Sequence, residues 1–171
     1  MIRSILLAGA IACLGFDANA APFSNRSVVM EWTTTGMSRR PDGNLAPFSN
    51  RIIHTVYVSS AGRLFARRHM ASLARGGGES SFERGPGGAG NTPRWRLAGS
   101  QLIGQGSEGG GATHIVATFD PSFTSCTVEV IYGRGNAGEH VYSKPGGGTV
   151  TSYDMRANGA RCSVREGNAF Q

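Results

Sequence analysis

Arginine is the residue type with the clearest chemical potential in this chain, because it is concentrated in one window. The chain has 17 lysines and arginines against 11 aspartates and glutamates, a net charge of +6. Between Arg39 and Arg75 there are seven arginines and a single acid, Asp42. A guanidinium group donates two parallel hydrogen bonds to a phosphate or carboxylate. This window therefore predicts a surface that binds anions.

Alternation along residues 63–70 sorts the side chains of this segment onto two faces of a strand. One face presents two arginines around an aromatic ring, whereas the other is mostly apolar and includes Arg68. We expect the apolar face to pack inward, with Arg68 reaching out at the strand end or along the surface. The anion-binding candidates are Arg39, Arg40, Arg63, Phe65, Arg67 and Arg68.

The partners expected for such a surface are anionic lipid, lipopolysaccharide or an acidic glycan, because arginine clusters attract polyanions. Nucleic acid is the weaker candidate for a chain that is expected to leave the cytoplasm. A second interpretation needs no partner: charged strand faces keep β proteins soluble and block edge-to-edge pairing. Both interpretations stay open at the level of sequence.

Residues typical of catalytic or metal sites are present but lack a diagnostic spacing. His54 and His69 flank one predicted hairpin, and the simpler interpretation is a cross-strand polar pair rather than two metal ligands. Asp120, His114 and Ser122 are close in sequence, but a triad is recognised by geometry and not by proximity along the chain. No catalytic or metal-binding residue is predicted. A small secreted hydrolase, with its site near a long glycine-rich segment, is the alternative function.

Two segments match the pattern G-x-G-x-x-G, at residues 85–90 and 104–109. In dinucleotide-binding proteins this pattern precedes a helix whose N-terminus faces the phosphates. No helix is expected after either segment here. The sequence therefore predicts no cofactor.

The first 20 residues have the pattern of a signal peptide. Arg3 precedes an apolar run over residues 5–16, and Ala18-Asn19-Ala20 matches a cleavage site, so we expect cleavage near Ala20. The run is shorter than the roughly 20 residues that span a bilayer. A membrane anchor and lipidation at Cys13 are the alternatives. We expect a periplasmic or secreted mature chain, residues 21–171, without a transmembrane segment.

Two cysteines remain after removal of the signal peptide, Cys126 and Cys162. A pair of cysteines in an exported protein indicates a disulfide. The alternative, a redox or nucleophilic pair, is less consistent with their separation of 36 positions.

The elements that would position these residues read as short strands separated by glycine. Residues 52–59 and 63–70 predict a hairpin in which Gly62 takes a positive φ. Residues 27–35 predict another strand, and the hexapeptide APFSNR occurs twice, at 21–26 and 46–51, as a turn leading into a strand.

The remainder of the chain has the same character. Residues 75–94 predict a glycine-rich loop, and Asn158-Gly159 predicts a hairpin turn between two short C-terminal strands. No segment shows a sustained helical period. We therefore predict an all-β fold: a single antiparallel β-sandwich or flattened barrel of about eight strands with one disulfide.

Three segments carry a resemblance to a known group: YVSSAGR at 57–63, FDPSFTSCTVEVIYGR at 119–134 and RCSVREGN at 161–168. They resemble small exported proteins of alphaproteobacteria, most of them uncharacterised, which have the same order of leader, hairpin and two cysteine strands. The resemblance implies a periplasmic or secreted β domain. It implies no activity, and no catalytic residue is transferred from it.

Overall fold

The computed structural model describes residues 23–75, 77–85, 93–108, 111–133, 139–143 and 149–170. The predicted signal peptide and its cleavage site lie outside these ranges. The described part consists of strands, turns and bends, and its ten strands lie in two sheets. The strands are β1 (Arg26–Arg39), β2 (Leu45–Val58), β3 (Leu64–Ser72), β4 (Glu79–Arg84), β5 (Arg94–Ala98), β6 (Gln101–Glu108), β7 (Gly111–Phe119), β8 (Cys126–Tyr132), β9 (Glu139–Ser143) and β10 (Thr149–Glu166).

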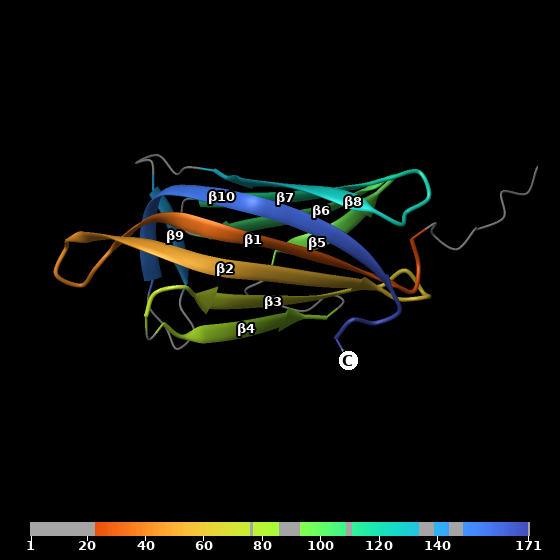
Figure 1. The fold of residues 1–171 in the computed structure, drawn as a ribbon, viewed down its shortest axis with the longest axis horizontal. Coiled ribbons are helices and arrows are strands. Elements are labelled where there is room, and N and C mark those ends of the chain that lie inside the picture. Colours follow the sequence, from red (N-terminus) through yellow and green to blue (C-terminus); the bar gives the residue numbers. More distant parts are fainter. Residues whose placement is uncertain are drawn as a thin grey trace, which may run out of the picture.

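The two sheets form a curled antiparallel sandwich. One sheet has six strands in the order β4-β3-β2-β1-β10-β9, and the other has four in the order β5-β6-β7-β8. Figure 1 shows β8 running alongside β10, where the two sheets approach each other. The predicted all-β sandwich is confirmed, with ten strands in the described residues rather than about eight.

The β2–β3 hairpin forms as the sequence predicts. Val58 lies opposite Leu64, and the Gly62 amide donates to the Ser59 carbonyl oxygen over 2.9 Å. Gly62 has a φ of +71°, the left-handed conformation that a residue without a Cβ adopts without strain. The hairpin was predictable because its turn chemistry and its alternating strands are local in sequence.

The predicted loop over residues 75–94 is wrong in its middle part. Residues 79–84 form β4, which pairs with β3 from Ala71 opposite Glu79 to Ala66 opposite Arg84. Glycines flank this six-residue stretch on both sides, so its alternating pattern is hard to recognise in the sequence. The strand forms because the edge of β3 offers it hydrogen-bonding partners. Residues 86–92 lie outside the described part.

The predicted hairpin at Asn158-Gly159 is also wrong, because residues 149–166 form one continuous strand. Gly159 has a φ of +63°, and the pairing with β1 gains one extra residue on β10 at this point. A second irregularity occurs at Asp154, whose φ is +50°. The left-handed conformation that suits a turn forms β-bulges here, because β1 pairs with β10 on both sides of each irregularity.

The two copies of APFSNR take different structures. Residues 46–51 lie within β2 and pair with β1, so the predicted turn before a strand is wrong for this copy. In the first copy Phe23 lies before β1, is fully buried and stacks on Phe119 with ring centroids 4.5 Å apart. β1 itself runs to Arg39, four residues beyond the predicted strand.

The core lies between the two sheets, and the predicted disulfide links these sheets. Cys126 on β8 and Cys162 on β10 are bonded, with Cα atoms 5.5 Å apart, and so join the two sheets covalently. The buried apolar residues come from both sheets and from the segment before β1: Phe23, Val28, Met30, Trp32, Ile52, Val56, Val58, Ala66, Leu102, Ile115, Ala117 and Phe119.

Candidate anion-binding site

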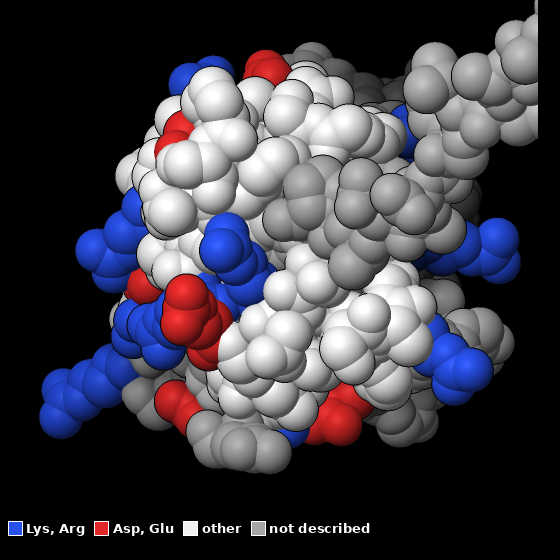
Figure 2. All heavy atoms as spheres, turned by 90° about the vertical axis from the view of Figure 1, so that its right-hand side faces the viewer, with Lys and Arg blue, Asp and Glu red and all other residues white. Residues whose placement is uncertain are grey.

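The six predicted anion-binding residues are not brought together in one patch. Arg39 and Arg40 lie at the β1–β2 turn, and Arg63 lies in the β2–β3 turn. These turns are at opposite ends of β2, whose 14 residues span roughly 45 Å. Figure 2 shows separate groups of basic atoms around one end of the molecule, with acidic atoms within the largest group.

Arg67 and Phe65 point outward as alternation predicts, but the charge of Arg67 is compensated. Its guanidinium lies 2.7 Å from Glu83 on β4, and its Cζ lies 5.0 Å from the centroid of the Phe170 ring. Phe65 packs beside Tyr57, with ring centroids 6.1 Å apart. Arg67 is therefore a weaker anion site than the sequence indicates.

Arg68 lies on the inner face of the sheet. It is opposite His54 in the β2–β3 register, its side chain is half-buried, and its Nε atom is not accessible to solvent. Alternation therefore predicts the correct face for Arg68, but its buried Nε does not support the expected reach toward the surface.

Arg39 is held in place by neighbouring side chains. It donates to the Tyr153 hydroxyl over 2.7 Å, and that hydroxyl donates to Glu139 over 3.2 Å. These contacts raise the pKa of Arg39, with the Tyr153 hydrogen bond as the largest cause. Arg40 and Arg63 are exposed at their two turns.

A different pair of arginines is brought together at the centre of the outer face. Glu31 on β1 accepts hydrogen bonds from the Nε of Arg51 on β2 over 2.6 Å and from the Nε of Arg161 on β10 over 3.2 Å. The arginine side chains are 49% and 71% exposed, whereas that of Glu31 is 19% exposed. These bonds lower the pKa of Glu31, that from Arg51 most and that from Arg161 next. The cluster carries a net charge of +1 and holds two guanidinium groups on one carboxylate.

Strand β10 extends this cluster into a row. Arg156, Arg161 and Arg165 are all exposed, and their partners on β1 are Thr35, Glu31 and Ser27. Those partners are four residues apart, so successive arginines of the row are about 13 Å apart. We call Arg51, Arg156, Arg161 and Arg165, together with Glu31, the arginine face.

The sequence gives no direct indication of this row. Arg156 and Arg161 are an odd number of positions apart, so strict alternation places them on opposite faces of a strand. The bulge at Gly159 inserts one residue and returns both to the outer face. Arg51 was inside the basic window, but its proximity to Arg161 depends on the non-local strand order β2-β1-β10.

The histidine pair predicted across the β2–β3 hairpin does not form. His69 lies opposite Ile53 and points outward to the Ser81 hydroxyl at 3.0 Å, whereas His54 is buried on the inner face. Among the described residues no three His, Cys, Asp or Glu side chains are grouped so that they could hold a metal ion.

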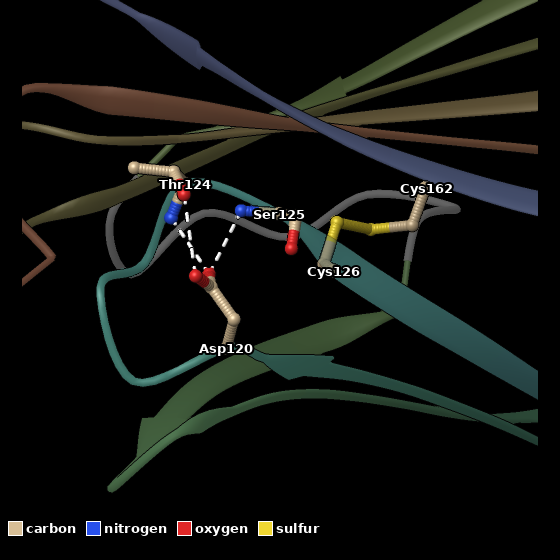
Figure 3. The surroundings of a disulfide bond; sticks show 5 residues. All are labelled: Asp120, Thr124, Ser125, Cys126 and Cys162. Atoms are coloured by element: carbon tan, nitrogen blue, oxygen red, sulfur yellow. Dashed lines mark hydrogen bonds between the residues drawn. A yellow bond between two sulfur atoms is a disulfide. The ribbon is translucent and has the colours of Figure 1, made fainter.

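Asp120 has a structural role in the β7–β8 loop. Its carboxylate accepts from the Thr124 and Ser125 amides, each over 2.8 Å (Figure 3). It also accepts a hydrogen bond from the Ser122 hydroxyl. These bonds lower its pKa, that from Ser122 most. His114 lies five residues from the end of β7, roughly 17 Å along the strand, so these residues form no triad.

A small polar cavity lies between β8, β9 and β10. Its volume is about 10 Å³, enough for one water molecule, and its lining includes His140 and Ser152, which face each other across β9 and β10. Ser152 is fully buried. A cavity of this size does not favour a substrate site.

Among the described residues no helix is long and apolar enough to cross a membrane. The chain matches no protein-family model, no curated protein and no solved structure.

Proposed function

We propose that this protein is an exported, non-enzymatic β domain that binds an acidic glycan of the cell envelope through the arginine face. The observation that supports this most directly is the row of three exposed arginines along β10, with Arg51 held beside Arg161 by Glu31. Thr33, which lies opposite Arg51 on β2 and Asn158 on β10, adds a hydroxyl group to this surface.

The geometry favours an extended polyanion over a single small anion. Three arginines about 13 Å apart on one strand match negative charges repeated along a polymer. Within the cluster Arg51 donates to Glu31 through its Nε, and the Arg51 side chain is 49% exposed. Both guanidinium groups can therefore bind oxyanions while Glu31 keeps them in position.

Two further features support a location outside the cytoplasm. A disulfide between Cys126 and Cys162 is typical of an oxidising compartment. The signal-peptide pattern of residues 1–20 and the resemblance to small exported alphaproteobacterial proteins point the same way.

Heparin serves as a model acidic glycan in the test of this proposal. We expect residues 21–171, with the disulfide intact, to bind heparin at low salt. The variant Arg51→Gln/Arg161→Gln should bind about tenfold or more weakly, because two charge-assisted contacts are lost. The measurement is the dissociation constant from titration at fixed ionic strength.

The matched control removes the same charge from the other sheet. Arg94 and Arg96 on β5 are exposed, so Arg94→Gln/Arg96→Gln changes the net charge equally without altering the arginine face. Equal weakening by both double variants would show attraction to net charge alone and overturn the site. Binding to anionic vesicles in place of heparin would overturn the choice of a glycan.

A further inference from the structure

The inner faces of β2, β3, β4 and β5 bring four polar side chains to one corner of the sandwich. His54 lies opposite Arg68, and Ser80 lies two residue pairs from Arg68 along the β3–β4 ladder, opposite Met70. The Trp95 ring approaches His54 edge-on, with centroids 5.6 Å apart. Because β4 and β5 are the edge strands of their sheets, this corner lies at the margin of the core.

Three buried polar atoms in this corner have no hydrogen-bond partner among the described residues: His54 Nδ1, Ser80 Oγ and Trp95 Nε1. His54 is 2% exposed. The indole nitrogen of the other tryptophan is paired, because the Trp32 Nε1 donates to the Tyr132 hydroxyl over 2.9 Å. Buried polar groups are nearly always paired, so three unmatched atoms in one corner indicate a ligand.

The donors and the charge of this corner indicate which class of ligand would fit it. The Trp95 indole N–H and the Ser80 hydroxyl donate hydrogen bonds, and the Arg68 guanidinium adds a positive charge beside His54. Trp32 stacks on the other side of His54, with centroids 5.2 Å apart, so the walls are aromatic. A group with two acceptor oxygens, a negative charge and an apolar remainder fits these features.

We propose that this corner binds a small organic carboxylate, with Trp95 and Ser80 as its hydrogen-bond donors and the positive charge of Arg68 close by. The site lies on the inner side of the six-stranded sheet and is separate from the arginine face.

The test uses the two tryptophans as internal reporters. In a ¹⁵N-labelled sample the indole N–H groups of Trp32 and Trp95 give two resonances, and Trp95→Phe assigns them. Titration with sodium acetate or sodium benzoate should move the Trp95 resonance in a saturable manner and leave that of Trp32 in place. Sodium chloride at equal ionic strength should move neither.

Variants separate this site from the rest of the protein. Ser80→Ala should weaken carboxylate binding about three- to tenfold, the worth of one hydrogen bond. Arg51→Gln/Arg161→Gln should leave the Trp95 titration unchanged, so failure of the glycan site and failure of this site are distinguishable. A Trp95 resonance that does not move, that moves equally with chloride, or that responds equally in Ser80→Ala would overturn the proposal.

Discussion

The free energy of unfolding should fall by about 4–5 kcal/mol, through His54 alone, as the pH is lowered from about 6.5 to about 3. Burial between Trp32 and Trp95 lowers the pKa of His54 to about 3, and the charge of Arg68 adds to the shift. In the unfolded chain the same imidazole has a pKa of 6.5. Between these values only the unfolded chain binds the proton, so stability is fully present above pH 6.5 and is lost as the pH falls.

Urea unfolding across a pH series measures this effect when His54→Phe is compared with the wild type. Phenylalanine keeps an aromatic ring between the two tryptophans and removes the titrating group. Glu31 and Asp120, whose pKa values are lowered, also lose stabilising interactions in acid, so the difference between the two proteins is the quantity of interest. An unchanged pH dependence in His54→Phe would contradict the assignment.

Removal of the disulfide should lower the free energy of unfolding by about 4 kcal/mol. The bond between Cys126 and Cys162 spans 36 residues, and closing a loop of this length restricts the unfolded chain by roughly that amount in the chain-entropy model. It also has a native-state role, because among the described strands β8 pairs only with β7 and has no hydrogen-bonded ladder to β10. Without the bond, contact between β8 and β10 depends on side-chain packing.

The measurement is urea unfolding of Cys126→Ala/Cys162→Ala beside the wild type with and without reductant. The variant and the reduced wild type should agree. Hydrogen exchange should show the largest loss of protection at β8, because it is an edge strand. A variant as stable as the oxidised wild type would show that packing alone joins the sheets.

The parts of the fold that the sequence predicts correctly depend on local chemistry. The β2–β3 hairpin follows from alternating strands around a turn that needs a positive φ at Gly62. The errors arise where a distant partner decides the outcome. β4 forms between glycine-rich segments because β3 offers a free edge, and Asn158-Gly159 becomes a bulge because β1 continues alongside.

The candidate site shows the same division. The excess of arginine near the β2–β3 hairpin is visible in the sequence, but pairing of Arg67 with Glu83 requires β4. The proximity of Arg51 and Arg161, 110 positions apart, requires both to flank β1. Composition therefore indicates the chemistry of the surface, whereas strand order determines which residues share it.

The salt dependence of heparin binding tests the arginine face most directly. Each cation that neutralises an anionic group contributes about 0.7–0.9 to the slope of log K against log salt concentration. Arg51→Gln/Arg161→Gln should reduce that slope by about 1.5, and Arg94→Gln/Arg96→Gln should leave it close to the wild-type value. Equal slopes in all three proteins, or no binding by the wild type at low salt, would contradict a glycan-binding role for the arginine face.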